Sequence, residues 1–287
     1  MQNSTAIFVT GATGNQGGAV ARSLINNGFK IKVITRNPSS VPAQNLKKLH
    51  AEIIQGDLNN TETYCAHIKD VDGIFAVLTY ENGIDKEIKQ GMDLVNLAKE
   101  YDIKHFLYSS VIGADQNTGI PHWETKYKIE NHIKQINLPY TIIRPASLFE
   151  NFLIPQVKSR ILKGKLASPV NKDVIQQFIC SKDIGEISAE IFMNPGKYSG
   201  KILTIAAQEM DMKEVANIFS EALGKEIKYQ KLPMFITRLV MGKDLYKMFK
   251  WINENDAVFL KDLYAFRKEY PKLIELKQWI QLNFKTT

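Results

Sequence analysis

Apolar residues in the first half of the chain gather in short runs, and most segments between these runs repeat apolar positions at helical spacing. The short runs predict strands that are covered on both faces. The longest helical segment has an apolar side that we expect to be buried, made of Ile84, Ile88, Met92, Val95, Leu97 and Ala98. The predicted strands are residues 5–10, 30–35, 51–55, 73–78, 103–108 and 140–144, and the predicted helices are residues 16–27, 84–101 and 122–136.

Strands that alternate with helices are typical of a parallel sheet with helices on both faces. The sequence therefore predicts an α/β fold, with a doubly wound parallel sheet of the Rossmann type over residues 1–150. The pattern loosens afterwards, and we expect residues 151–287 to form a smaller α/β lobe, parts of which can join the sheet. Its predicted strands are residues 174–180, 202–205 and 228–232, and its predicted helices are residues 154–162, 211–223 and most of 233–282.

The first predicted strand leads directly into a glycine-rich loop that opens a helix. Gly11, Gly14 and Gly17 follow the spacing G-x-x-G-x-x-G. Glycine lets the backbone approach a ligand closely, and the N–H groups that open a helix favour an anion. The alternative is a glycine-rich turn without a ligand, but the strand, loop and helix in this order predict a phosphate cradle for a dinucleotide. The expected ligand contacts are Gly11, Thr13, Gly14, Asn15, Gln16 and Gly17.

The second predicted strand ends in Thr35, and Arg36 follows it. NAD-binding folds usually place an acid here to accept the ribose hydroxyls. An arginine instead donates a fork of N–H groups that matches a 2′-phosphate, which a carboxylate would repel. We therefore predict that NADP(H) is preferred over NAD(H). The alternative is a surface arginine at the start of a loop.

Two further strand ends are expected to contact the cofactor. Asp57 and Leu58 follow the third strand, where Asp57 either accepts from the adenine amino group or caps the next helix. Leu78 and Thr79 end the fourth strand, beside the expected position of the nicotinamide ribose, because ligands bind at the carboxyl ends of such strands.

Composition narrows the protein class. The chain has 287 residues, 44 % of them hydrophobic, as in a soluble globular protein. It has no apolar run long enough to span a bilayer, and its first predicted strand begins too early to leave room for a signal peptide. Cys65 and Cys180 are isolated, so we expect a reducing cytoplasm and no structural metal.

The net charge of +7 comes entirely from residues 151–287, because residues 1–150 contain 15 basic and 15 acidic side chains. The lysines alternate with acids, which favours a solvated surface over a binding face for nucleic acid. Residues 231–251 mix cations with methionine and aromatic residues; packing on the protein is favoured over an adaptable pocket or partner surface.

Several motifs resemble the short-chain dehydrogenase/reductase superfamily, in its extended and atypical branch, and within it the NmrA-like family. They are the glycine loop, residues 35–37, 56–58, 121–130 and 144–152, with a weaker match at 180–185. Active members of the superfamily use a Tyr-x-x-x-Lys pair on the helix after the fifth strand. The resemblance places its lysine at Lys126, but the tyrosine position holds His122.

Lys126 is therefore expected to bind the cofactor ribose, the alternative being an ordinary exposed helix lysine. His122 is a candidate acid–base residue, although a solvated or capping histidine is the more common case. We expect Tyr80, Trp123, Phe149 and Phe152 to line a substrate pocket. Ser109 and Ser110 are expected to be hydrogen-bonding residues at a strand end or contacts of the nicotinamide, rather than proton donors.

These features support two functions. The first is an NADPH-dependent reductase that acts on a quinone, an imine or an activated carbonyl compound without the usual tyrosine acid. The second is a redox sensor that binds NADP(H) and regulates a protein partner, as the NmrA-like resemblance implies. The aromatic residues favour the reductase slightly. The sequence predicts neither nucleic-acid nor membrane binding, and it is compatible with a homodimer.

Overall fold

The structure is a computed structural model that describes residues 5–80 and 83–284. These residues form two compact units. The first comprises the described residues of Met1–Asp115, His122–Arg144 and Ser181–Leu203, and the second those of Gln116–Pro121, Pro145–Cys180 and Thr204–Thr287. The division is thus not a single cut near residue 150, because residues 181–203 return to the first unit.

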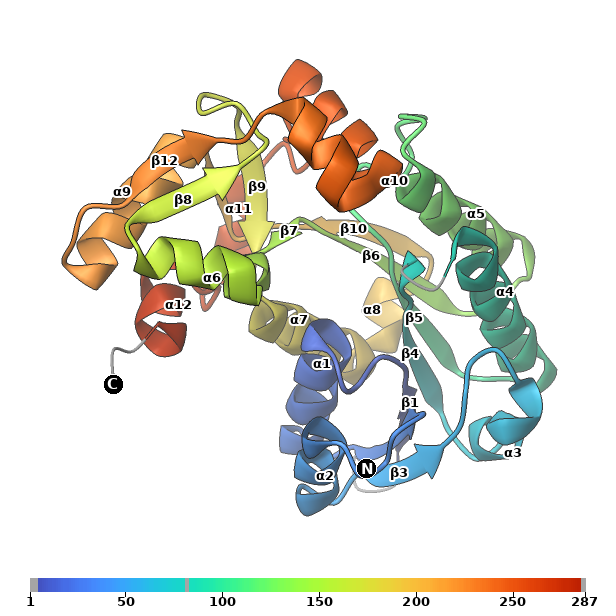
Figure 1. Ribbon diagram of the computed structural model, residues 1–287. Coiled ribbons are helices and arrows are strands. Elements are labelled where there is room, and N and C mark those ends of the chain that lie inside the picture. The colour runs from blue at the N-terminus through green and yellow to red at the C-terminus, as the bar shows by residue number, and fades with distance from the viewer. Residues whose placement is uncertain (1–4, 81–82, 285–287) are drawn as a thin grey trace. The chain divides into compact units, whose positions relative to one another are not determined.

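The first unit is built around a sheet with the strand order β10-β6-β5-β4-β1-β2-β3 (Figure 1). All neighbouring pairs from β3 to β6 are parallel. The direction of chain progression reverses between β1 and β4, which is where ligands bind in folds of this kind. The strands are β1 (Ala6–Val9), β2 (Lys30–Thr35), β3 (Glu52–Gln55), β4 (Gly73–Val77), β5 (His105–Ser109), β6 (Tyr140–Pro145) and β10 (Lys201–Ile205). The predicted doubly wound α/β fold and its six strands are confirmed.

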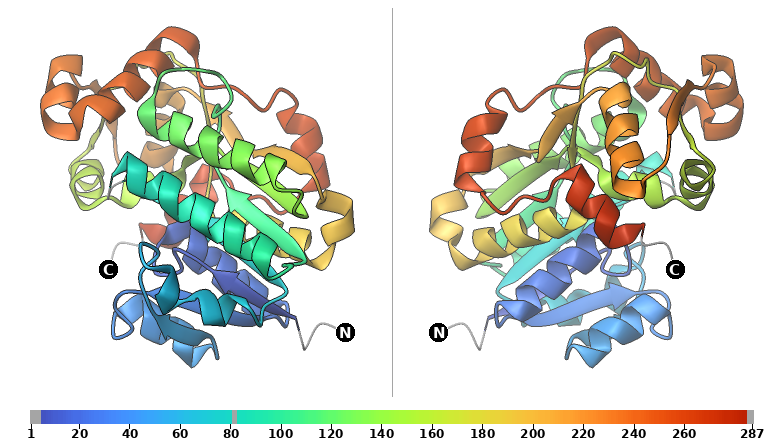
Figure 2. Two further views of the ribbon diagram at one scale, coloured as in Figure 1. Left: turned by 90° about the vertical axis from the view of Figure 1, so that its right-hand side faces the viewer. Right: turned by 90° about the vertical axis from the view of Figure 1, so that its left-hand side faces the viewer.

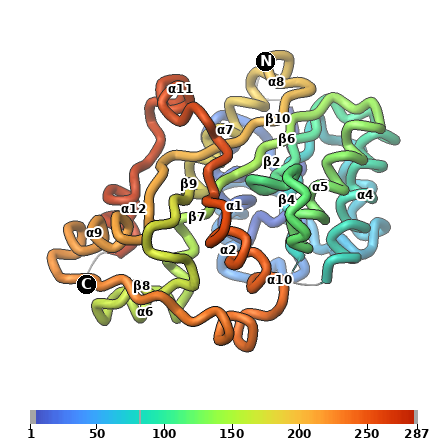
Figure 3. The backbone as a smooth tube through the Cα atoms, turned by 90° about the horizontal axis from the view of Figure 1, so that it is seen from above, coloured from blue at the N-terminus to red at the C-terminus, as the bar shows by residue number. Residues whose placement is uncertain are grey.

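Helices cover both faces of this sheet. One face carries α1 (Asn15–Asn26), α2 (Val41–Lys48) and α7 (Ser181–Met193), and the other carries α3 (Cys65–Ile68), α4 (Ile84–Glu100) and α5 (Pro121–Gln135) (Figure 2). Helices α4 and α5 lie side by side (Figure 3). Helix α7 packs so closely on α1 that a Cβ atom at Gly185 would lie 2.7 Å from the backbone oxygen of Ala19. The short α8 (Pro195–Tyr198) precedes β10.

The buried side of α4 agrees with the predicted one at Val95 and Ala98 but differs from it elsewhere. Ile84 is 37 % exposed, and Ile88 and Met92 are only half-buried. The buried positions are Glu87, Gln90, Gly91, Leu94, Val95 and Ala98. The helix is therefore rotated relative to the simplest hydrophobic pattern, and a carboxylate faces the interior.

The second unit contains two small sheets. Strand β9 (Gln176–Ile179) lies between β7 (Ser147–Leu148) and β11 (Gln208–Met210), and β8 (Lys165–Ser168) pairs in parallel with β12 (Lys228–Lys231). The helices are α6 (Pro155–Leu162), α9 (Met212–Leu223), α10 (Met234–Asn255), α11 (Leu263–Glu269) and α12 (Leu276–Asn283), and a 3₁₀ turn spans Phe149–Leu153. The sequence did not predict α2, β7, β8 or β11.

Helix α10 only partly meets the expectation that its segment packs on the protein. The chain bends at Gly242. After the bend, Met248, Phe249 and Trp251 pack against the core of the second unit. Before the bend, Phe235, Leu239 and Val240 are exposed.

Candidate functional site

The glycine loop connects β1 to α1 at the carboxyl edge of the sheet. The Thr10 hydroxyl donates to the backbone oxygen of Val77 at 2.8 Å and accepts from the backbone N–H of the same residue at 2.9 Å, which joins the ends of β1 and β4. The Gly14 N–H then donates to the Gly11 oxygen at 2.9 Å and closes the turn. Of the predicted contact residues, Gly11, Thr13, Gly14 and Asn15 are exposed, Gln16 is half-buried and Gly17 is buried.

Gly17 is the glycine of this loop at which an added side chain would come closest to the backbone. A Cβ atom there would lie 2.4 Å from the Thr10 oxygen and 2.5 Å from the Gly11 oxygen. The first turn of α1 can therefore approach the end of β1 only because residue 17 is glycine. Among the described residues, no side chain caps α1, and its first turn contains no acid. The arrangement leaves N–H groups and the positive end of the helix dipole open to an anion.

Gln16 links the loop to another strand end. Its Oε1 atom accepts a hydrogen bond of 2.7 Å from the hydroxyl of Ser109, the last residue of β5. Ser110 follows as a buried residue, and its hydroxyl has no hydrogen-bond partner in the described part of the chain. Ser109 is thus a hydrogen-bonding residue at a strand end, as predicted.

Arg36 lies directly after β2, and its side chain is exposed. The following turn is closed by short-range bonds, from the Asn37 N–H to the Thr35 hydroxyl at 3.2 Å and from the Ser39 hydroxyl to Asn37 Oδ1 at 2.7 Å. Within residues 5–80 and 83–284, the guanidinium of Arg36 forms neither an ion pair nor a hydrogen bond. Arg36 therefore carries a permanent positive charge at the end of β2, the strand that pairs with β1. A ligand could bind its guanidinium without breaking an interaction with another described residue.

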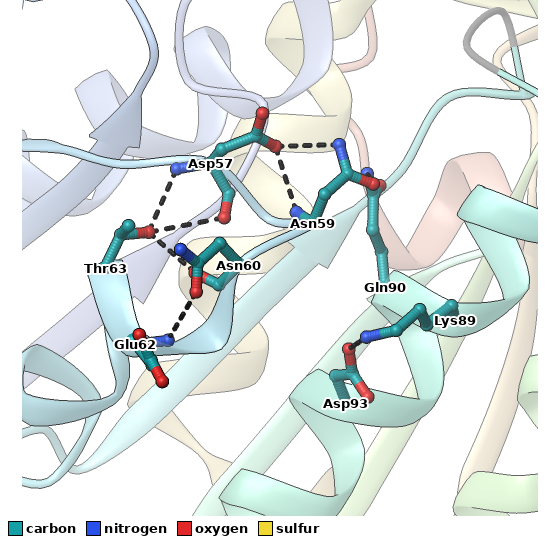
Figure 4. A network of polar contacts seen from close by, with 8 residues as sticks. All are labelled: Asp57, Asn59, Asn60, Glu62, Thr63, Lys89, Gln90 and Asp93. Carbon is teal, nitrogen blue, oxygen red and sulfur yellow. Dashed lines mark hydrogen bonds and ion pairs between the residues drawn. The ribbon is translucent and has the colours of Figure 1, made fainter.

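Asp57 closes its own turn after β3 (Figure 4). Its Oδ1 atom accepts from both the backbone and the side-chain amide of Asn59, each at 2.9 Å. The cap of the following 3₁₀ helix is Asn60, which accepts from the Glu62 N–H at 3.1 Å. The capping role that the sequence allowed for Asp57 is therefore wrong. Leu58, which follows it, is half-buried.

Lys126 is buried on α5. Its Nζ atom donates to the Leu78 oxygen at 2.8 Å and lies 2.6 Å from Glu87 Oε1. Leu78 is buried directly after β4, and Thr79 beyond it is exposed. The alternative of an ordinary exposed lysine is wrong, because this ammonium is fixed at the edge where β4 ends.

The sequence reasoning missed Glu87. This residue lies on α4, its side chain is fully buried, and its Oε2 atom accepts a bond of 2.6 Å from the Thr125 hydroxyl. A signal was present, because Glu87 precedes Gly91, Leu94 and Ala98 at helical spacing, and these positions share one buried side of α4. An acid in such a row predicts a buried partner.

The imidazole ring of His122 packs against two aromatic side chains, Tyr80 and Trp123. It stacks on Tyr80 with centroids 4.6 Å apart and planes 23° apart, and Trp123 meets its edge at 6.3 Å. The imidazole is buried, so the solvated histidine that we expected as the common case is wrong. Tyr80 and Trp123, both predicted to line a pocket, are thus brought together around His122.

Tyr108 is the tyrosine beside Lys126, whose Nζ atom lies 5.9 Å from the centre of its ring. Burial raises the pKa of this phenol well above its ordinary value, and the charges of Glu87 and Glu130 raise it further. Tyr108 is therefore a weaker acid than an ordinary phenol, and its hydroxyl is buried without a hydrogen-bond partner among the described residues.

The sequence profile of the NmrA-like family matches residues 3–276. The chain belongs to the NmrA-like family. It is 30 % identical to an NmrA-like family domain-containing oxidoreductase, FrzB of Cladobotryum sp, over 253 residues, or 78 % of this chain and 75 % of that protein.

Two solved structures share the fold of this NmrA-like protein. The NADPH-dependent quinone oxidoreductase of Escherichia coli, complexed with NADPH, has a TM-score of 0.80 and 21 % identity, with 97 % of this chain and all of that chain covered. NmrA itself, a negative transcriptional regulator complexed with NADP, has a TM-score of 0.79 and 19 % identity, with 99 % and 96 % covered.

The NmrA-like chain buries a further pair of charged residues. Arg144 on β6 donates from Nε to Glu130 at 2.9 Å and from Nη2 to the other oxygen of that carboxylate at 2.6 Å, and its Nη1 atom lies 2.6 Å from Asp115. Burial acts to lower the pKa of Arg144, but Glu130 and Asp115 outweigh it and raise the pKa. The Arg-Pro motif of the resemblance is thus part of an ion-pair network.

Phe149 and Phe152 lie in the aromatic core of the second unit. Phe149 stacks on Phe178 at 6.1 Å, and Phe152 meets Phe219 edge-on at 5.2 Å. Trp279 packs against both rings. This packing accounts for both side chains, so we assign them to the core of this NmrA-like protein rather than to a substrate wall.

Other kinds of site find little support. A cavity of about 520 Å³ in the second unit is lined by none of the predicted site residues. Residues 5–80 and 83–284 contain no cluster of three or more His, Cys, Asp or Glu side chains that could hold a metal ion. In the same described residues, no helix has both the length and the apolar character needed to cross a membrane.

Proposed function

We propose that this NmrA-like protein binds NADP(H) and uses it to reduce a small acceptor, namely a quinone, an imine or an activated carbonyl compound. The observation that carries the cofactor assignment is the pairing of the open α1 N-terminus with an unpartnered Arg36. The helix end favours the pyrophosphate, and Arg36 favours a 2′-phosphate. This supports NADP(H) over NAD(H). NmrA is also known in complex with NAD, so family membership alone does not decide between them.

The other end of the site supports an acceptor that needs little help with protonation. When bound, NADPH supplies a hydride. Lys126 would hold the ribose of the nicotinamide half, and Tyr80 and Trp123 would offer apolar surface to an acceptor. His122 is the remaining candidate for an acid, but its ring is stacked on Tyr80, and Tyr108 is fully buried with its pKa raised by that burial. The protein would then contribute mainly orientation and the exclusion of water.

The E. coli quinone oxidoreductase and the Cladobotryum oxidoreductase support a reductase, since both have the fold or the family of this chain. A second candidate function, an NADP(H)-responsive sensor for a protein partner, is favoured by the missing tyrosine and by the regulatory role of NmrA. In both cases we propose a cytoplasmic protein. The reductase would turn over an acceptor, whereas the sensor would bind a protein partner without turnover.

The test is NADPH oxidation, followed by the nicotinamide absorbance, with a panel of quinones, imines and aldehydes. Binding of NADPH and NADP⁺ is measured in parallel by calorimetry. Turnover of one of these acceptors supports the reductase. Measurable binding without turnover of any acceptor rejects the reductase and leaves the sensor.

A further inference from the structure

Glu87 is a carboxylate with no access to solvent in the interior of the first unit. A buried charge is costly unless it is paired and hydrogen-bonded. The residue stands on α4, in the row of positions that otherwise holds Gly91, Leu94 and Ala98. If this position served only for packing, burying a leucine there would cost less free energy than burying a carboxylate. The contacts of the carboxylate therefore have to explain why it is buried.

Both oxygens of Glu87 are used by α5. Oε1 lies 2.6 Å from the ammonium of Lys126, and Oε2 accepts from the Thr125 hydroxyl at 2.6 Å. The Thr125 hydroxyl also contacts the backbone oxygen of His122 at 3.1 Å. Glu87 thus fixes two consecutive side chains on the helix that carries the superfamily lysine.

The ammonium of Lys126 has three N–H donors. One of them donates to the Leu78 oxygen at 2.8 Å, at the carboxyl end of β4, and the ammonium is also ion-paired with Glu87 Oε1 at 2.6 Å. No other described residue accepts from this ammonium, and the Tyr108 ring lies on one side of it at 5.9 Å. The ion pair with Glu87 and the hydrogen bond to Leu78 hold the ammonium where β4 ends, and they leave it N–H capacity for a ligand.

We infer that Glu87 is a positioning residue for cofactor binding: by holding the Lys126 ammonium against the Leu78 carbonyl, it directs the remaining N–H toward the ribose hydroxyls of the nicotinamide half. Glu87 itself does not touch the cofactor. This inference rests on the proposed NADP(H) site. It predicts that Glu87 affects only the half of the dinucleotide that Lys126 reaches.

A purely structural role is the competing explanation. An ion pair that merely clamps α4 to α5 would change stability, and any effect on binding would be the same for ligands that occupy either half of the site. The two explanations are separated by comparing NADPH with adenosine 2′,5′-bisphosphate, which has the adenine, the ribose and the 2′-phosphate but lacks the nicotinamide ribose.

The variant for this comparison is Glu87→Gln, which keeps the shape and the hydrogen-bonding oxygen but removes the charge. Glu100→Gln is the matched control, because Glu100 is an exposed acid on the same helix. We expect Glu87→Gln to weaken NADPH binding about tenfold, the equivalent of one hydrogen bond to a charged group. Binding of adenosine 2′,5′-bisphosphate should stay at the wild-type value, and Glu100→Gln should change neither.

A double-mutant cycle tests whether Glu87 acts through Lys126. Lys126→Met should lower the affinity for NADPH by at least as much as Glu87→Gln does. Adding Glu87→Gln to Lys126→Met should then lower this affinity no further. If Glu87→Gln does not fold, Glu87→Asp retains the charge but withdraws it from Lys126, and it should show a smaller loss that is again confined to NADPH. Thermal unfolding of each variant checks that it is folded.

Three results would overturn the inference: equal weakening of NADPH and adenosine 2′,5′-bisphosphate, an undiminished effect of Glu87→Gln in the Lys126→Met background, or wild-type NADPH affinity in both Glu87 variants. Wild-type protein that fails to bind NADPH would overturn the inference together with the proposed cofactor. Wild-type protein that binds NADPH but reduces no acceptor would reject the reductase alone, and the Glu87 comparison would still decide the inference.

Discussion

The two ends of the candidate cofactor site differ in how their polar groups are used. At the open end, around the glycine loop and Arg36, no side chain caps the N-terminus of α1, and the guanidinium lacks a protein partner among the described residues. At the closed end, formed by Glu87, Lys126, Glu130 and Arg144, every charged group is buried and already paired. The hydrogen-bond donors of the open end are available to a ligand. Most charged groups of the closed end instead bind one another and stabilise the fold.

This difference separates recognition from reaction. Strong, unpartnered donors at the open end favour an anionic ligand because no internal ion pair has to be broken. At the closed end, a ligand can bind only donors or acceptors that the internal pairs do not use, such as a remaining N–H of the Lys126 ammonium. The site is therefore better equipped to bind a dinucleotide than to deliver a proton.

Two arginines provide the strongest test of this comparison. Arg144→Met leaves the buried Glu130 without its bidentate partner, and we expect the free energy of unfolding to fall by about 4 kcal/mol. The same substitution at the exposed residue, Arg36→Met, should change it by less than about 0.5 kcal/mol. Urea unfolding of both variants measures the difference. Similar losses at both positions would show that the two ends are not distinct.

The open end was predictable from the sequence because its signals are local. Gly17 and Arg36 belong to a strand, a loop and a helix that are adjacent in the chain, so spacing alone places Gly17 at the start of α1 and Arg36 at the end of β2. The Rossmann-type sheet was predictable for the same reason, since each strand is a buried run of its own.

The closed end could not be predicted in the same way. The partner of Lys126 is Glu87, on another helix, and α4 is rotated so that this acid faces inward while Ile84 is exposed. Phe149 and Phe152 resembled pocket residues because nothing local indicates that Phe178 and Trp279 cover them. The roles of Lys126, Phe149 and Phe152 thus depend on contacts with segments that are distant in the sequence.

A smaller effect is expected in cofactor choice. Arg36→Met removes the group that we assign to the 2′-phosphate, so NADPH should bind about tenfold more weakly while NADH binding stays constant. Lys48→Met, on the exposed end of α2, serves as the control for the loss of one positive charge. Titration of each variant with both cofactors measures the ratio. An unchanged preference for NADPH would mean that another residue recognises the phosphate.

The smallest effect is expected at His122. Phenylalanine preserves a flat ring that can stack on Tyr80, but it cannot donate a proton. If His122 serves only as packing, His122→Phe should reduce an acceptor at a rate within about twofold of wild type across the neutral pH range, whereas loss of a general acid typically costs about a hundredfold or more. His132→Phe, on the same helix but hydrogen-bonded to Asn96, is the matched control. A hundredfold loss confined to His122→Phe would make the imidazole the acid that replaces the missing tyrosine, and the closed end would then take part in the reaction as well as in the fold.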